Sequence, residues 1–144
     1  MEDAVEYDGS GRFAGVLKDE KPTGFGTWQL ESGAEFRGVF HEGKASGWGR
    51  FQSPSQDYVY IGQFEEGLPH GIGLMQWEHQ TYYGMWEKGQ IAGAGLFAWD
   101  DGTEFEGQFE YGQRVGRGIE RHVGGRQEIV EYGSDGKIVA RDTF

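Results

Sequence analysis

A sequence repeat is the feature that most constrains the fold of this chain. The Gly-x-Gly motif occurs five times, starting at Gly24, Gly47, Gly71, Gly93 and Gly116. The intervals between these motifs are 23, 24, 22 and 23 residues, and an aromatic residue followed by x-Gly lies eleven residues before each motif. Such a constant period predicts a tandem array in which every unit adopts the same local structure.

Within each unit, apolar and polar residues alternate with a period of two, which is typical of β-strands. The fifth unit illustrates the pattern: a short strand at 105–109, a turn rich in glycine, and a second strand that carries Gly-x-Gly. Each unit is therefore predicted to be a β-hairpin. Five hairpins in series predict an all-β fold, an elongated and twisted single antiparallel sheet.

Alternation also predicts which side chains share a face of this sheet. One face receives the opening aromatic, the residue four positions later, and the residues two and four positions beyond the second glycine of Gly-x-Gly. Of these 20 positions, 17 are apolar, and Ser53, Glu120 and His122 are the exceptions. The glycines lie on the same face, where aromatic rings can lie flat on a neighbouring backbone that has no Cβ. We call it the aromatic face, and expect its last unit to end the core with polar groups.

The segment GAGLFAWDDG, residues 93–102, begins like a loop that cradles phosphate. A nucleotide-binding loop needs a third glycine and a following helix whose N-terminus receives the phosphate. Strand-like residues and a turn follow here instead, and the motif recurs in every unit. The segment is therefore predicted to be a strand and turn of the fourth hairpin, with no cofactor.

The repeated pattern, aromatic-x-Gly-x-aromatic-x-x-Gly-x-x-x-Gly-x-Gly with a later Asp-Gly, resembles the MORN (membrane occupation and recognition nexus) repeat. Residues 82–104 carry this pattern almost throughout, and five units fit it: 13–35, 36–59, 60–81, 82–104 and 105–127. The resemblance implies a solenoid-like array of hairpins used as a binding surface. It also implies a cytoplasmic protein associated with the cytoskeleton, a cilium or another large assembly.

The two flanks are predicted to cap the array. Residues 1–12 hold four acidic side chains and an Asp-Gly turn, which favours an N-terminal cap. Residues 128–144 hold two β-branched stretches around Gly133-Ser134-Asp135-Gly136. These stretches favour a hairpin that covers the last sheet edge, with a short helix as the alternative.

Little in the sequence favours catalysis. The chain has no cysteine, and its four histidines fall at different positions of the repeat with no spacing typical of metal ligands. The acidic run at 100–104 lacks the spacing of a calcium-binding loop and is predicted to be the turn of the repeat. We therefore expect neither an enzyme nor a metal-binding protein.

The second face of the sheet is unexpectedly apolar. A free-standing sheet should be polar there, yet units two to four place apolar residues on it: Trp48, Ile61, Ile72, Leu74, Tyr83, Met85, Ala94, Leu96 and Ala98. Such a patch is typical of an interface, so we expect a protein partner that contributes a helix or an extended segment. Alternatively this face is the packed one and the aromatic face forms an open groove, with Trp86 and Trp99 as anchors.

Charge distribution limits the kinds of partner. The net charge is −11, which disfavours nucleic acid and anionic membranes. The only basic cluster is formed by Arg114, Arg117, Arg121 and Arg126. These residues could orient an acidic partner or, as an alternative function, bind anionic phospholipid headgroups. Opposite charge bias at the two ends also leaves self-association into a homo-oligomer open.

Overall fold

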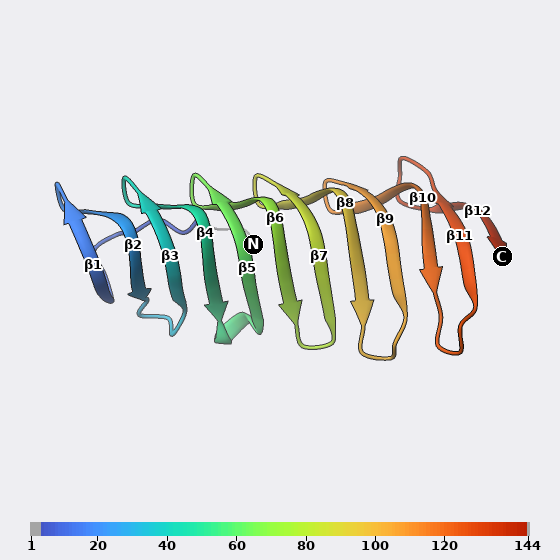
Figure 1. The fold of residues 1–144 in the computed structure, drawn as a ribbon, viewed down its shortest axis with the longest axis horizontal. Coiled ribbons are helices and arrows are strands. Elements are labelled where there is room, and N and C mark those ends of the chain that lie inside the picture. The colour runs from blue at the N-terminus through green and yellow to red at the C-terminus, as the bar shows by residue number, and fades with distance from the viewer. Residues whose placement is uncertain (1–3, 144) are drawn as a thin grey trace.

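The computed structural model describes residues 4–143 and shows one antiparallel sheet of twelve strands, in which spatial order equals chain order (Figure 1). The elements are β1 (Arg12–Lys18), β2 (Lys21–Gln29), β3 (Glu35–His41), β4 (Lys44–Ser53), the 3-10 turn η1 (Pro54–Gln56), β5 (Tyr58–Glu65), β6 (Leu68–Trp77), β7 (Gln80–Glu87), β8 (Gln90–Trp99), β9 (Glu104–Glu110), β10 (Gln113–Arg121), β11 (Gln127–Tyr132) and β12 (Ile138–Thr143). The predicted all-β array of hairpins is confirmed, and the sheet remains open.

The array has six hairpins, one more than the repeat count of the sequence. Residues 128–144 were expected to form either a hairpin or a short helix, and β11 and β12 pair as an antiparallel hairpin against β10. Chain order is kept because each hairpin is joined to the next by a short turn (Figure 1). Among the residues that the structure describes, no helix is long and apolar enough to cross a membrane.

Two-residue turns connect the strands of each hairpin in the first five units. In the fourth hairpin, Lys88 and Gly89 have φ values of 47° and 83°, which is the positive-φ pair of a type I′ turn. The first hairpin has Glu20 where the others have glycine, and Glu20 adopts φ 66°. The turn geometry therefore survives this departure from the repeat, at the cost of strain in a residue that has a Cβ.

A row of glycines crosses the sheet beneath the aromatic rings. Gly38, Gly49 and Gly62 lie opposite one another on three successive strands. A Cβ on Gly49 would lie 2.6 Å from Cε1 of Phe36, so the ring occupies the space that any larger residue would need. Glycine and aromatic residues are enriched together because the ring lies directly on the glycine backbone.

The aromatic face is the core of the protein. Its rings contact one another edge-on from hairpin to hairpin, with centroids 5.2 Å apart for Phe36 and Phe64 and 5.3 Å apart for Tyr60 and Trp86. Tyr60 and Tyr82 have no exposed surface. The alternative in which this face is an open groove throughout is thus wrong, because its central rings are covered by their neighbours.

The N-terminal strap, residues 4–10, runs back across hairpins one to three. Val5 donates its amide N–H to the carbonyl of Gly67 at 2.7 Å and accepts from the amide of Ala45 at 3.0 Å. Tyr7 donates its amide to the carbonyl of Gly43 at 2.8 Å, and the Val5 side chain is buried in the core. The predicted N-terminal cap is thus a strap over the core, and its residues 1–3 lie outside the described residues.

Candidate functional site

The outer face of the sheet, opposite the aromatic core, carries an exposed apolar strip over β4 to β8. The strip consists of Trp48, Ile61, Ile72, Leu74, Tyr83, Met85 and Leu96. Trp48 and Tyr83 are its most exposed members, at 58% and 54%, and none of the seven belongs to the core cluster. They are seven of the nine residues that sequence alternation placed on the second face; the other two are Ala94 and Ala98.

Strand register arranges part of this strip in a line perpendicular to the strands. Ile61 lies opposite Leu74, Leu74 opposite Tyr83, and Tyr83 opposite Leu96. Adjacent strands are about 4.8 Å apart, so the four side chains follow one another over roughly 14 Å. Ile72 and Met85 form a second opposed pair beside this line.

Charged residues bound the line at its two ends. Arg50 lies opposite Ile61 at one end, and Arg37 lies opposite Arg50 on the next strand. At the other end Glu106 lies opposite Leu96 and accepts a hydrogen bond from Arg121 at 2.8 Å. Arg50 makes no hydrogen bond or ion pair with another described residue, so its charge is available to a ligand.

Trp86 and Trp99, the anchors of the alternative groove, lie on the aromatic face and have different surroundings. Trp86 is 4% exposed, and its indole N–H donates to the carbonyl of Gly73 at 3.1 Å. We therefore assign Trp86 to the core. Trp99 is half-buried, stacks on Phe97 at 5.6 Å and lies beneath the guanidinium of Arg114.

The four arginines of the basic cluster are each engaged with residues of the chain itself. Arg114 donates to the hydroxyl of Tyr132 at 2.6 Å, and Arg117 donates to Glu131 at 3.2 Å. Arg121 pairs with Glu106, and Arg126 lies 3.4 Å from Glu128. The structure does not bring the four side chains together as one anion site.

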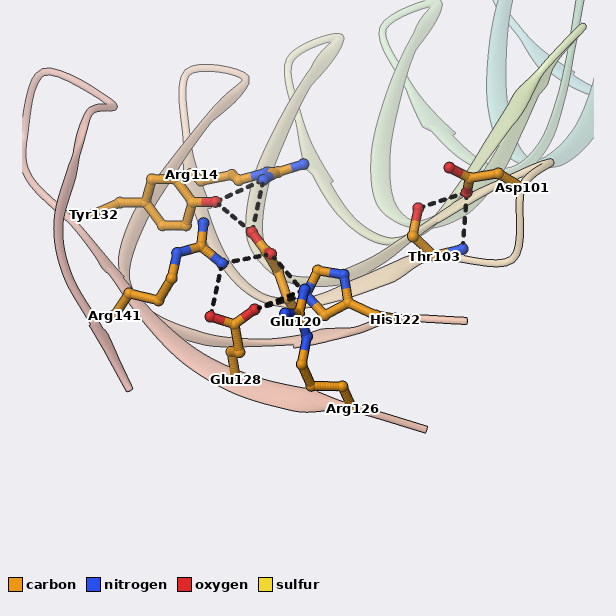
Figure 2. Close-up of polar contacts among 9 residues, drawn as sticks. All are labelled: Asp101, Thr103, Arg114, Glu120, His122, Arg126, Glu128, Tyr132 and Arg141. Carbon is orange, nitrogen blue, oxygen red and sulfur yellow. Dashed lines mark hydrogen bonds and ion pairs between the residues drawn. The ribbon is translucent and has the colours of Figure 1, made fainter. Parts of the chain in front are cut away.

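A polar cap joins the end of the fifth hairpin to the sixth and consists of Glu120, His122, Glu128 and Arg141 (Figure 2). Arg141 lies 3.0 Å from Glu120 and 3.1 Å from Glu128, while the Nε2 atom of His122 lies 2.9 Å from Glu128. Nε2 is buried yet makes no well-directed hydrogen bond. Arg141 is the main reason that the pKa of Glu128 lies below its ordinary value.

Glu120, His122 and Glu128 are close enough to contact a single metal ion, since their ligand atoms lie within 4.8 Å of one another. Arg141 already pairs with both carboxylates, however, and a metal ion would have to displace that guanidinium. The arrangement therefore fits an electrostatic cap of the aromatic core. Sequence spacing alone did not reveal it, because Glu120 and His122 come from the end of the fifth hairpin and Glu128 from the sixth.

The family comparison agrees with this geometry. The MORN repeat model matches residues 36–58, 60–78, 82–104 and 105–125. The chain belongs to the MORN repeat family. Among curated proteins, no significant relative is found.

The MORN units matched by the family model correspond to hairpins two to five, which the repeat period also delimits. The first and sixth MORN-like hairpins fall outside the matched ranges. In the sixth, Glu128 and Val130 stand where the other units have the opening aromatic and its glycine. Tyr132 nevertheless packs on Phe105 with ring centroids 5.6 Å apart, so the hairpin continues the core without the sequence signature.

Proposed function

We propose that this MORN array is a non-catalytic binding module that uses the apolar strip of its outer face to hold a segment of another protein. The observation that carries the proposal is that one sheet face is buried by its own rings, while the other carries seven exposed or half-buried apolar side chains, four of them in one line across the strands. Exposed apolar patches of this kind are typical of interfaces.

The partner segment is best described as an amphipathic helix with acidic residues at one end. A helix that crosses the strands would place successive turns, about 5.4 Å apart, over side chains spaced at about 4.8 Å. Its acidic end would lie over Arg37 and Arg50, which lie opposite each other on neighbouring strands. Arg37 already pairs with Glu35 at 3.3 Å, so of the two only Arg50 lacks a charged partner among the described residues. The proposal includes a role as a subunit of a larger cytoplasmic assembly, such as one of the cytoskeleton or a cilium.

Lipid recruitment receives less support from the same structure. The basic cluster that would bind anionic headgroups is engaged by Glu131, Glu106, Glu128 and Tyr132. An anionic surface would have to compete with these internal partners and with a net charge of −11.

The decisive experiment compares affinity capture by three forms of the protein. Trp48→Asp combined with Tyr83→Asp puts two charges in the strip, and Val123→Asp adds one to an exposed apolar side chain in a turn outside it. We expect a stoichiometric partner to be retained by the native protein and Val123→Asp, and lost with the double variant, while circular dichroism shows that all three are folded. A partner whose recovery is unchanged by the double variant would refute this use of the strip.

Light scattering and vesicle flotation distinguish other occupants. Self-association that the double variant abolishes would identify a second copy as the occupant of the strip. Binding to phosphoinositide vesicles that is lost in Arg117→Glu, while the strip variant still binds, would favour the lipid function instead.

A further inference from the structure

A pocket lies over the aromatic face between the N-terminal strap and the far ends of hairpins one to three. Its volume is about 650 Å³, which is in the range of sites for small ligands and side chains. Trp28, Phe51 and Met75 supply apolar surface to it, and Trp77 and Tyr58 add two half-buried rings. The pocket lies on the face opposite the apolar strip.

The pocket exists because one hairpin lacks a large side chain. Ser53 occupies the position that holds Leu30, Trp77 and Trp99 in the first, third and fourth hairpins. It follows Phe51 by two residues and lies opposite Tyr58, which in turn lies opposite Trp77. A serine there leaves the space that a leucine or tryptophan side chain would otherwise fill.

Ser53 is itself an unusual residue. It is only 5% exposed, and its side chain makes no hydrogen bond with another described residue. Ser53 also lines the pocket, and its hydroxyl group can both donate and accept a hydrogen bond there. A hydroxyl oxygen accepts readily from an N–H donor.

The charges around the pocket indicate which ligand would enter. Glu6 and Asp8 of the strap both line it, and no lysine, arginine or histidine does so among the described residues. Asp8 accepts hydrogen bonds from the amide and hydroxyl of Ser10, which keep the pKa of its carboxyl below the ordinary value. Trp28 donates its indole N–H to the carbonyl of Ser10 at 2.8 Å and so fixes this part of the strap beside the pocket.

The aromatic side chains are placed to contact a cation. Trp77 stacks on Phe97 at 6.0 Å with the two planes 8° apart, and Phe97 does not line the pocket. Trp77 itself lines the pocket, so part of its indole ring borders this space. Indole faces attract ammonium and guanidinium groups, and the apolar surface suits the methylene stem of a lysine or arginine.

From this combination we infer that the pocket receives a basic side chain of a partner protein, with its cationic group between the strap carboxylates and Ser53 and its stem against the rings. The site is independent of the apolar strip, because it lies on the other face and uses different residues. Charge complementarity also fits the wider surface, since residues 1–113 hold 19 acidic and 7 basic side chains.

Nuclear magnetic resonance titration with blocked amino acids tests the inference directly. N-acetyl-arginine amide and N-acetyl-lysine amide are the probes, and N-acetyl-norleucine amide is the neutral control of similar length. We expect saturable shifts of the Trp28 and Trp77 indole N–H signals with the cationic probes only, and weaker binding at higher salt. Equal shifts with norleucine, or no saturable shift with either cation, would overturn the inference.

Two kinds of variant locate the binding. Ser53→Trp fills the pocket with the residue that Trp77 and Trp99 supply in other hairpins, and should abolish the shifts. Asp8→Asn retains the turn acceptor for Ser10 but removes the charge, and should weaken binding about fivefold or more. Glu110→Gln, on the fifth hairpin outside the pocket, is the matched control and should bind like the native protein.

The variants also distinguish failure of the pocket proposal from failure of the proposal for the apolar strip. If Ser53→Trp does not fold, Asp8→Asn still decides the question, since Asn at this position preserves the hydrogen bonds of the strap. Unchanged probe affinity in Asp8→Asn and in Glu6→Gln would refute the role of the strap carboxylates. The Trp48→Asp and Tyr83→Asp variant should bind the cationic probes normally, whether or not the outer strip proves to bind a partner.

Discussion

The indole N–H of Trp86 donates to the carbonyl oxygen of Gly73 at 3.1 Å and links the fourth hairpin to the third. The same ring packs edge-on against Tyr60 and Tyr82, at 5.3 and 5.5 Å. The Trp86 side chain therefore contacts both the row of glycines and the aromatic rings of adjacent repeats. In a single-layer sheet such contacts replace the second layer that other β proteins use to bury a core.

Replacement of Trp86 is predicted to lower the free energy of unfolding strongly. Trp86→Ala should cost about 3–5 kcal/mol because it opens a cavity among buried rings. Trp86→Phe should cost about 1–3 kcal/mol because the Gly73 carbonyl loses its donor. Urea denaturation followed by circular dichroism measures both values, and Trp48→Ala on the exposed face is the control, expected to change stability by less than about 0.5 kcal/mol.

The close approach of Phe36 to Gly49 predicts a second, local effect. Gly49→Ala should destabilise the protein by about 1–3 kcal/mol, because the added methyl group would overlap the Phe36 ring. Phe36→Leu in the same chain should recover part of this loss. A double-mutant cycle measures the coupling, and strictly additive changes would show that the ring does not restrict residue 49.

Most of the fold follows from the sequence because its determinants are local and repeated. Turn residues such as Gly89 and the aromatic at each repeat start, such as Tyr82, recur at fixed intervals, so one unit predicts the next. The sixth hairpin is harder to predict because Glu128 and Val130 replace the residues that define the repeat. Its strands form because β11 pairs with the edge of β10 and Tyr132 packs on Phe105.

The candidate sites are predictable to different degrees. Alternation is sufficient to place Trp48 and Tyr83 on the outer face, since a strand has only two faces. It cannot show that Trp86 is covered, because coverage depends on the curvature that brings neighbouring rings together. The docking of Val5 on Gly67 is likewise absent from any local pattern, because it joins residues from distant parts of the chain.

The buried tyrosines predict a loss of stability at alkaline pH. Burial raises the pKa of Tyr82 from 10.0 to about 12, and burial also raises the pKa of Tyr60. Because the folded pKa is above the unfolded one, the contribution to stability is complete below pH 10 and declines as the pH rises towards 12. Tyrosinate absorbance should therefore develop together with unfolding for these two residues.

Phenylalanine variants test the assignment of this alkaline transition. Tyr82→Phe removes a titrating group and also the hydrogen bond that Tyr82 donates to the Met85 carbonyl at 3.0 Å. We expect lower stability at neutral pH and a weaker dependence on pH above 10. An unchanged alkaline dependence in both Tyr60→Phe and Tyr82→Phe would show that other groups cause the transition. Tyr111→Phe, in an exposed turn, is the control.

The polar cap predicts the opposite dependence at acid pH. The pKa of Glu128 lies below its ordinary value of 4.5, first because Arg141 donates a hydrogen bond to its carboxylate. A depressed folded pKa stabilises the protein above pH 4.5, and this stabilisation is lost as the pH falls through the folded pKa. Thermal denaturation between pH 7 and about pH 3 should show this loss in the native protein.

Glu128→Gln isolates the contribution of this carboxylate to the sixth hairpin. The variant should be less stable than the native protein at pH 7, because Arg141 and Arg126 lose their shared charge partner. The difference should shrink as the pH falls, since protonation removes the same charge from the native protein. Glu110 is an exposed residue of β9, and the stability of Glu110→Gln should show the same pH dependence as that of the native protein. A constant difference between Glu128→Gln and the native protein at every pH would mean that packing, and not charge, joins β11 to the end of the core.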